Sequence, residues 1–537
     1  MKSILIAIFL AAAFSAPATA PLRGGDRLRE LVVFPEMSIN FKWGISCQNN
    51  EWGIYQTMDL PDAIAEQREK LKRQSDDAKQ LMQLGYLLDQ NGETNESQSC
   101  YQKAEQLCRN KVAANPQDGL SLTELGVALD GLDKKDEAEH NFRKATLVSS
   151  NEWKCWVGLG NFLADDAFYS LFAKNIRNLV APAQMPSAKV LSYHPSAEVL
   201  KKSETLCAEA SQCFNRALQL APREPEVFVQ RAGYMSISNL QNCYIRYYRD
   251  NEKITTNEWL LSFIAPQTIA NLKKVTELKP KDYQYTSLVA YFEYLVSAMK
   301  LHPQNATHFA PDTLPDKTRQ SIHAAMTRLE NLSEDADKKT ATGALENLGI
   351  LNMMFENMPE AATDFRRAVA LDPTRRQSWD LLFASLFESA SPDELAAVCE
   401  SRLKYDNSAR NHITLSKIFA QKMSKWKEAA EQAEIAEKLE TNNVVPPLLL
   451  AAIALKQSEQ TNYLTIAKID MNRANTILKE IPAGDEKTKR WREFMLDGAI
   501  VSALNNQPQF ARDWLNEVLK YFPNDKTAKE ILEAIND

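Results

Sequence analysis

The amino-acid sequence repeats its own pattern at an interval of 34 residues, and this period constrains the fold more than any other feature. One copy runs through Leu122, Leu125, Gly126, Leu129, Ala138, Phe142 and Ala145. Its first four positions recur 34 residues later as Trp156, Leu159, Gly160 and Leu163. A further copy runs through Leu345, Leu348, Gly349, Ala361, Phe365, Ala368 and Pro373. A period of this length in a chain of 537 residues indicates one repetitive architecture rather than several unrelated domains.

Each copy predicts two antiparallel helices that pack closely against each other. The glycines let the two helices approach, and the first alanine of each copy is small for the same reason. Phe142 and Phe365 are expected to fill the space between repeats, and Pro373 to end a second helix. Stacked copies of such a pair form a solenoid in which each repeat contacts its neighbours.

The spacing resembles the tetratricopeptide repeat, W-x2-L-G-x2-Y…A-x3-F…P. The resemblance implies an all-α, right-handed superhelical solenoid of antiparallel helix pairs, here of an exported bacterial type, that binds proteins or peptides on a concave surface. Several members of the family bind a C-terminal carboxylate through Lys and Asn on the inner helices. At those register positions this chain has Thr123 and Val127 in one repeat and Val157 and Asn161 in the next, so this mode is not supported.

The chain divides by composition and register into six segments. Residues 1–18 are predicted to be a signal peptide, because Lys2 precedes the apolar run Ile4–Phe14 and small residues suit cleavage after Ala18. An uncleaved membrane anchor is the alternative; no later stretch is apolar and long enough to span a bilayer. The other segments are an N-terminal segment with a lead-in helix (19–77), repeats (78–163), degenerate repeats with insertions (164–341), repeats (342–525) and a C-terminal capping helix (526–537).

Residues 38–57 alternate in the manner of strands. Ile39, Phe41, Trp43 and Ile45 alternate with polar residues or glycine, and the turn-prone Gln48-Asn49-Asn50 follows. The pattern predicts a small β-hairpin, which either caps the first helices or offers a sheet edge to a partner.

Chemical motifs are nearly absent from the sequence. It has no phosphate-binding loop, no dinucleotide fingerprint, no zinc-protease motif and no C-x-x-C pair, so we expect no catalytic residue, cofactor or metal. The net charge of −7 leaves no basic surplus for a nucleic-acid partner. Whether any of the eight Cys form disulfides is left open.

The candidate partner-binding residues lie in the enlarged middle of the chain. Three successive repeats there carry extra residues, and insertions in solenoids often map to the binding face. Eight of the sixteen Tyr fall between residues 234 and 294. We single out Tyr244, Arg246, Tyr247, Tyr248 and Arg249. Tyr offers broad contact area at low entropic cost, and Arg pairs with acidic groups. The alternative is that the three Tyr, at positions i, i+3 and i+4, lie on a helix face that is turned to the protein core.

The leading hypothesis for function is a non-enzymatic scaffold, periplasmic or secreted, that holds a protein or peptide partner and has no integral membrane span. Two alternatives stay open. One is an enzyme or enzyme subunit with its site within residues 164–341, and the other is a protein that binds glycans of the cell envelope through exposed aromatic rings.

Overall fold

The computed structural model describes residues 29, 31–34, 43–48, 51–56, 60–73, 76–90, 93–172, 194–250, 255–301, 314–355, 357–387, 389–457, 461–481 and 484–536. The expected signal peptide, residues 1–18, lies outside the described residues. The chain forms two compact units: the large unit, Phe41–Asp372, and the small unit, Pro373–Asp537 together with Met1–Asn40. The division at Pro373 falls inside the segment 342–525 that the register treats as continuous.

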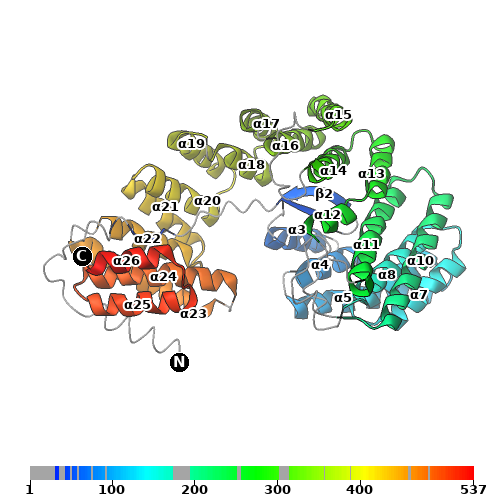
Figure 1. Ribbon diagram of the computed structural model, residues 1–537, viewed down its shortest axis with the longest axis horizontal. Helices are drawn as coiled ribbons and strands as arrows, with labels where there is room; N and C mark the ends of the chain where they lie inside the picture. The colour runs from blue at the N-terminus through cyan, green and yellow to red at the C-terminus, as the bar shows by residue number, and fades with distance from the viewer. Residues whose placement is uncertain are drawn as a thin grey trace. The chain divides into compact units, whose positions relative to one another are not determined.

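The large unit is a series of helix pairs with one hairpin. Its elements are β1 (Trp43–Gln48), β2 (Glu51–Gln56), α3 (Leu60–Arg73), α4 (Ala78–Gln90), α5 (Thr94–Ala114), α6 (Gly119–Gly131), α7 (Lys135–Val148), α8 (Trp153–Tyr169), α10 (Ala197–Leu220), α11 (Pro225–Asp250), α12 (Thr256–Phe263), α13 (Pro266–Leu278), α14 (Tyr283–Leu301), α15 (Asp316–Ser333), α16 (Lys338–Met354) and α17 (Met358–Leu371). Most of these helices pack on the next one in the chain, as α6 does on α7 and as α4 does on α5 (Figure 1).

The small unit continues the same construction. Its elements are α18 (Arg376–Leu386), α19 (Pro392–Leu403), α20 (Ala409–Lys417), the π-helical turn η3 (Ile418–Lys422), α21 (Trp426–Leu439), α22 (Val445–Lys456), α23 (Thr461–Glu480), α24 (Asp485–Leu504), α25 (Pro508–Tyr521) and α26 (Lys526–Asn536). The last of these, α26, lies within the segment 526–537 and buries Ala528, Ile531 and Ala534 in the core of α22–α25. Both units are therefore stacks of helix pairs, as the 34-residue period predicts.

The predicted hairpin is present. β1 and β2 pair antiparallel, with Ile45 opposite Ile54 and Gln48 opposite Glu51. Among the elements of the large unit, β2 lies beside α14 and α11.

The glycines of the repeat pattern lie under aromatic rings, as the close approach of two helices requires. A Cβ atom built on Gly126 would lie 2.9 Å from Phe142, and one built on Gly349 would lie 2.6 Å from Phe365. Gly160 has the same relation to Phe214, with a Cβ distance of 3.0 Å. Each ring therefore packs against the glycine of its own repeat.

The rings also reach the next repeat. Phe142 lies 5.2 Å from Phe162 between ring centroids, so it fills the space between repeats as well as the space within one. The four alanines of the pattern are fully buried; they are Ala138, Ala145, Ala361 and Ala368. Pro373 lies two residues beyond the end of α17 and its carbonyl accepts a hydrogen bond from the Trp379 indole at 2.8 Å.

Candidate functional site

The structure places the predicted Tyr–Arg cluster at the carboxyl end of α11, with its members in different environments. Tyr244 is 1% exposed and meets the rings of Phe168 and Phe172 at centroid distances of 5.8 and 5.0 Å. It belongs to the core, so a partner cannot contact it. Tyr247 and Tyr248 are half-buried, and Tyr248 stacks on Tyr244.

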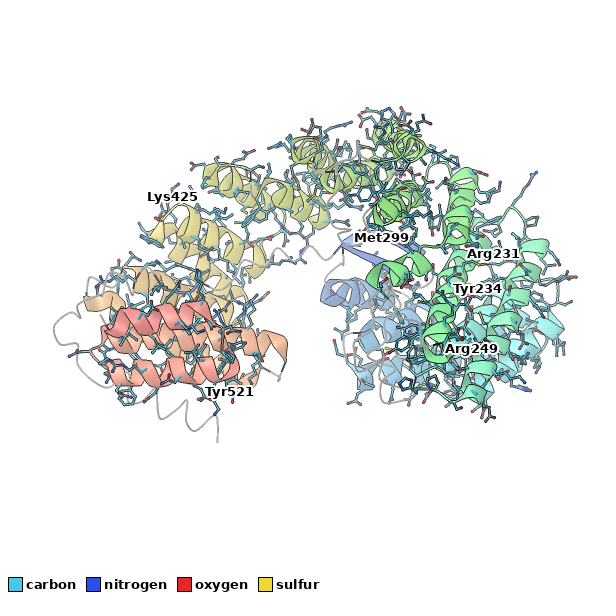
Figure 2. All side chains as sticks on the ribbon, viewed as in Figure 1. Arg231, Tyr234, Arg249, Met299, Lys425 and Tyr521 are labelled. Atoms are coloured by element: carbon cyan, nitrogen blue, oxygen red, sulfur yellow. The ribbon has the colours of Figure 1, made fainter. Side chains whose placement is uncertain are left out.

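The two arginines of the cluster point outward. Arg246 and Arg249 are exposed. Arg249, which Figure 2 labels, donates to the Glu204 carboxylate of α10 at 2.7 Å. The structure thus separates the cluster into a core residue, Tyr244, and a polar edge. Whether that edge binds a partner stays a prediction.

Other tyrosines of the enriched region are also packing residues. Tyr234 lies in the core of the large unit (Figure 2), stacks on Phe214 at 4.7 Å and donates its hydroxyl to the Cys207 carbonyl at 3.0 Å. Burial, as the largest cause, raises the pKa of Tyr234 to about 12. Tyr285 and Tyr294 are buried as well. The concentration of Tyr between residues 234 and 294 is therefore largely a property of the core.

A second candidate site lies in the small unit, where the chain's own residues 31–34 are docked. Leu31, Val32, Val33 and Phe34 form a short segment without helix or strand structure. Val32 is 7% exposed and belongs to the apolar core that α22–α26 build, while the other three side chains pack partly buried against that core. We call this contact region, including Asp497 and Trp426, the Asp497 site.

Two polar or aromatic contacts fix the docked segment. The backbone N–H of Val33 donates to Oδ1 of Asp497, on α24, at 2.9 Å. The Phe34 ring stacks on Trp426, the first residue of α21, with 6.5 Å between centroids and 13° between ring planes. Figure 2 labels Lys425, the residue that precedes Trp426 in the chain. The segment is thus held by one main-chain hydrogen bond, one buried aliphatic side chain and one ring stack.

Asp497 stands on a polar row of α24. Arg490, Glu493 and Asp497 are all buried and are spaced so that they share one helix face. The Arg490 guanidinium donates to both carboxylate oxygens of Glu493, at 3.1 and 2.8 Å. Burial raises the pKa of Asp497 well above its usual range; the Glu493 charge raises it further, whereas the Val33 N–H and Lys456 lower it.

One departure from the repeat pattern marks this site in the sequence. In four repeats a leucine directly precedes the helix-packing glycine; these buried residues are Leu84, Leu125, Leu159 and Leu348. Gly498 has the same relation to Trp514 as Gly349 has to Phe365, but the residue before Gly498 is Asp497. A carboxylic acid therefore occupies a position that these four repeats fill with a buried leucine.

The described residues show neither a metal centre nor a membrane-spanning helix. No group of three or more His, Cys, Asp or Glu in the described ranges could hold a metal ion. Among the helices that the structure describes, none combines the length and the apolar character needed to cross a bilayer.

Seven described cysteines are free thiols, and all but Cys207 are buried.

Comparisons with known proteins place one segment in a family. A sequence model described as tetratricopeptide repeat matches residues 78–111, which are α4 and most of α5. A search of curated proteins finds no match. Among the solved structures that match is yeast Tom70, which is 14% identical with a TM-score of 0.31; the match covers 90% of this chain and 92% of the Tom70 chain.

Two further solved structures are similar over shorter parts of the chain. The C-terminal part of a repeat-containing protein from Cytophaga hutchinsonii is 15% identical over 50% of this chain and 93% of its own, with a TM-score of 0.37. YrrB, described as having an unusual peptide-binding site, is 14% identical over 39% of this chain and 98% of its own, with a TM-score of 0.29.

Proposed function

We propose that this chain is a tetratricopeptide-repeat protein, and that it is an exported, non-enzymatic scaffold of the cell envelope that holds a protein or peptide partner at the Asp497 site. Repeat proteins of this architecture expose long helical surfaces on which partners dock. The apolar run Ile4–Phe14 with its flanking residues supports export.

One observation supports the choice of site. Residues 31–34 lie against α22–α26 as a peptide would, since they contribute side chains and a backbone N–H but no secondary structure of their own. A surface that accommodates one irregular segment of four residues has the means to accommodate another of similar chemistry. The Arg246–Arg249 edge of α11 is the second candidate surface, and it is the alternative that the experiment must separate.

The test compares partner binding by three variants of the full chain. A partner is first identified by co-purification from the envelope fraction of the source cell, and is then purified and titrated against each variant. Trp426→Ala should weaken binding about tenfold or more, because a stacking ring at the centre of a contact typically contributes at that level. Trp156→Ala is the matched control, since Trp156 lies in the large unit and donates to the Ser150 carbonyl.

The third variant carries Arg246→Ala and Arg249→Ala together. It should bind the partner as the wild type does. Loss of binding in this double variant with full binding by Trp426→Ala would move the site to α11 and contradict the proposal.

A further inference from the structure

The departure of α24 from the repeat pattern has a chemical consequence. A buried leucine before the packing glycine needs only apolar neighbours, but a carboxylic acid in the same place needs a hydrogen-bond donor. Asp497 is 1% exposed, and its side chain receives the backbone N–H of Val33. The donor comes from 464 residues away in the chain rather than from a neighbouring helix. The small unit therefore has a buried hydrogen-bond acceptor, Asp497, whose donor is the backbone N–H of a docked peptide segment.

A main-chain donor also imposes a restriction on what binds. Every amino acid except proline has a backbone N–H at that position. The hydrogen bond therefore depends on the backbone conformation of the bound segment, and only proline is excluded there. Side-chain preferences come from the flanking contacts. The Val32 side chain is buried among aliphatic residues of α22–α26, and the Phe34 ring lies parallel to the Trp426 ring.

We propose that the Asp497 site recognises irregular peptide segments with an aliphatic residue, then a residue with a backbone N–H, then an aromatic residue, and that Val32-Val33-Phe34 is a resident copy that such a partner displaces. This proposal rests on the proposed function, and it adds the chemistry of the partner and the competition. The small contact area of the resident segment favours displacement, because the segment is short and three of its four side chains are only partly buried. A tethered segment competes at a high effective concentration, so an external peptide binds more weakly while the resident copy is in place.

The test uses a fluorescein-labelled synthetic peptide that copies residues 27–38 and is titrated against the full chain by fluorescence anisotropy. Val32→Asp should release the resident segment, because it would bury a carboxylate next to Asp497. The labelled peptide should then bind the variant about tenfold or more tightly than it binds the wild type. Val127→Asp is the matched control: Val127 is 41% exposed on α6 of the large unit, and the variant should bind as the wild type does.

A second peptide tests the hydrogen bond itself. It carries N-methylvaline at the position of Val33 and so lacks the N–H that Asp497 receives. Loss of a hydrogen bond to a buried carboxyl group should weaken its binding to the Val32→Asp chain by about tenfold or more. A third peptide with Phe34→Ala should also bind more weakly, because it has no ring to stack on Trp426.

Three results would overturn the proposal. They are equal binding of the methylated and unmethylated peptides, no peptide binding by the Val32→Asp chain, and a change from dimer to monomer on Val32→Asp, which would assign the segment to a second copy. If Val32→Asp does not fold, hydrogen exchange at the Val33 amide of the wild type decides: protection should fall when the peptide is added in excess, and unchanged protection contradicts displacement. If only the proposed function is wrong, the synthetic peptide should still bind the Val32→Asp chain, whereas Trp426→Ala should leave binding of the envelope partner unchanged.

Discussion

At the scale of single residues, the contact between a glycine and a ring predicts a graded cost of adding one methyl group. A Cβ atom on Gly498 would lie 1.8 Å from the Trp514 ring, whereas one on Gly85 would lie 3.0 Å from the Tyr101 ring. Gly498→Ala should destabilise the chain by about 1–3 kcal/mol through overpacking, and Gly85→Ala by less, because alanine also favours the helix by about 1 kcal/mol.

Denaturant unfolding of the full chain measures this difference. Gly484→Ala is the control, since nothing lies within 4 Å of its Cβ position, and it should be nearly neutral. Equal stability of Gly498→Ala and Gly484→Ala would show that the Trp514 ring moves aside at no cost.

The buried carboxyl group of Asp497 predicts a dependence of stability on pH. Because burial raises its pKa in the folded chain, the folded state binds a proton more tightly than the unfolded state does. The carboxyl group therefore lowers stability as pH rises from its ordinary pKa, near 3.8, through the raised value. Asp497→Asn keeps an acceptor oxygen for the Val33 N–H and removes this titration.

The expected result is that the stability of Asp497→Asn relative to the wild type increases as the pH rises above the ordinary aspartate pKa of 3.8. Urea unfolding at several pH values measures the difference. If the difference in stability is the same at every pH measured, Asp497 does not titrate over those pH values, which would contradict its raised pKa.

Residue positions fixed by the 34-residue period could be predicted from sequence, and positions that depart from it could not. Gly126 precedes Phe142 by 16 residues and Gly349 precedes Phe365 by 16, and a constant interval of this kind is what two helices in contact require. Asp497 differs from its leucine counterparts, and its donor is Val33, near the other end of the chain. Nothing local in either segment indicates the other, so the site could not be derived from spacing.

At the scale of elements, the middle helices are long, and their extra length needs its own core. α10 has 24 residues and α11 has 26. Beyond the reach of the repeat pattern, Phe168 and Phe172 meet Tyr244, and Gln241 donates to the Ser203 hydroxyl at 2.7 Å. The aromatic enrichment that indicated a binding surface is, at Tyr244, the packing of these extensions. Periodicity alone could not decide between the two, because a core face and a binding face have the same spacing.

This account of α11 separates two sets of substitutions. Tyr244→Ala should cost about 3–5 kcal/mol, because it leaves a cavity between α8 and α11. Arg246→Ala combined with Arg249→Ala should change stability by less than about 1 kcal/mol, because the ion pair of Arg249 with Glu204 is solvent-exposed. Thermal unfolding followed by circular dichroism compares the two. Similar losses in both variants would indicate that the arginines, too, are structural.

The extra residues between Gly160 and Phe214 show which part of a repeat is constrained. Gly160 precedes Phe214 by 54 residues, whereas Gly126 precedes Phe142 by 16, yet both glycines lie under their rings. The contact between the two helices of a pair is therefore kept while the chain between them lengthens. In the described part of this insertion, residues 197–209 are helix, the amino-terminal part of α10, rather than a surface loop.

At the scale of the whole molecule, the arrangement of cores predicts that damage stays within one unit. One apolar core joins α22–α26 with Val32, and another joins α4–α11 in the large unit. In a stack of repeats, stability is approximately a sum of terms for single repeats and for neighbouring pairs. Trp514 is 1% exposed in the first core, and Phe142 is 2% exposed in the second.

Trp514→Ala should therefore lower the free energy of unfolding by about 3–5 kcal/mol, and the loss of stability should be confined to the small unit. We expect faster hydrogen exchange in α22–α26 and at the Val33 amide, because the docked segment loses the core on which it rests. Exchange in α4–α8 should be unchanged. Phe142→Ala is the matched control, with the opposite pattern: faster exchange in α4–α8 and unchanged protection at Val33. If either variant instead lost protection uniformly over both units, the chain would unfold as one cooperative body, and its repeats would not act as the semi-independent layers that the two cores imply.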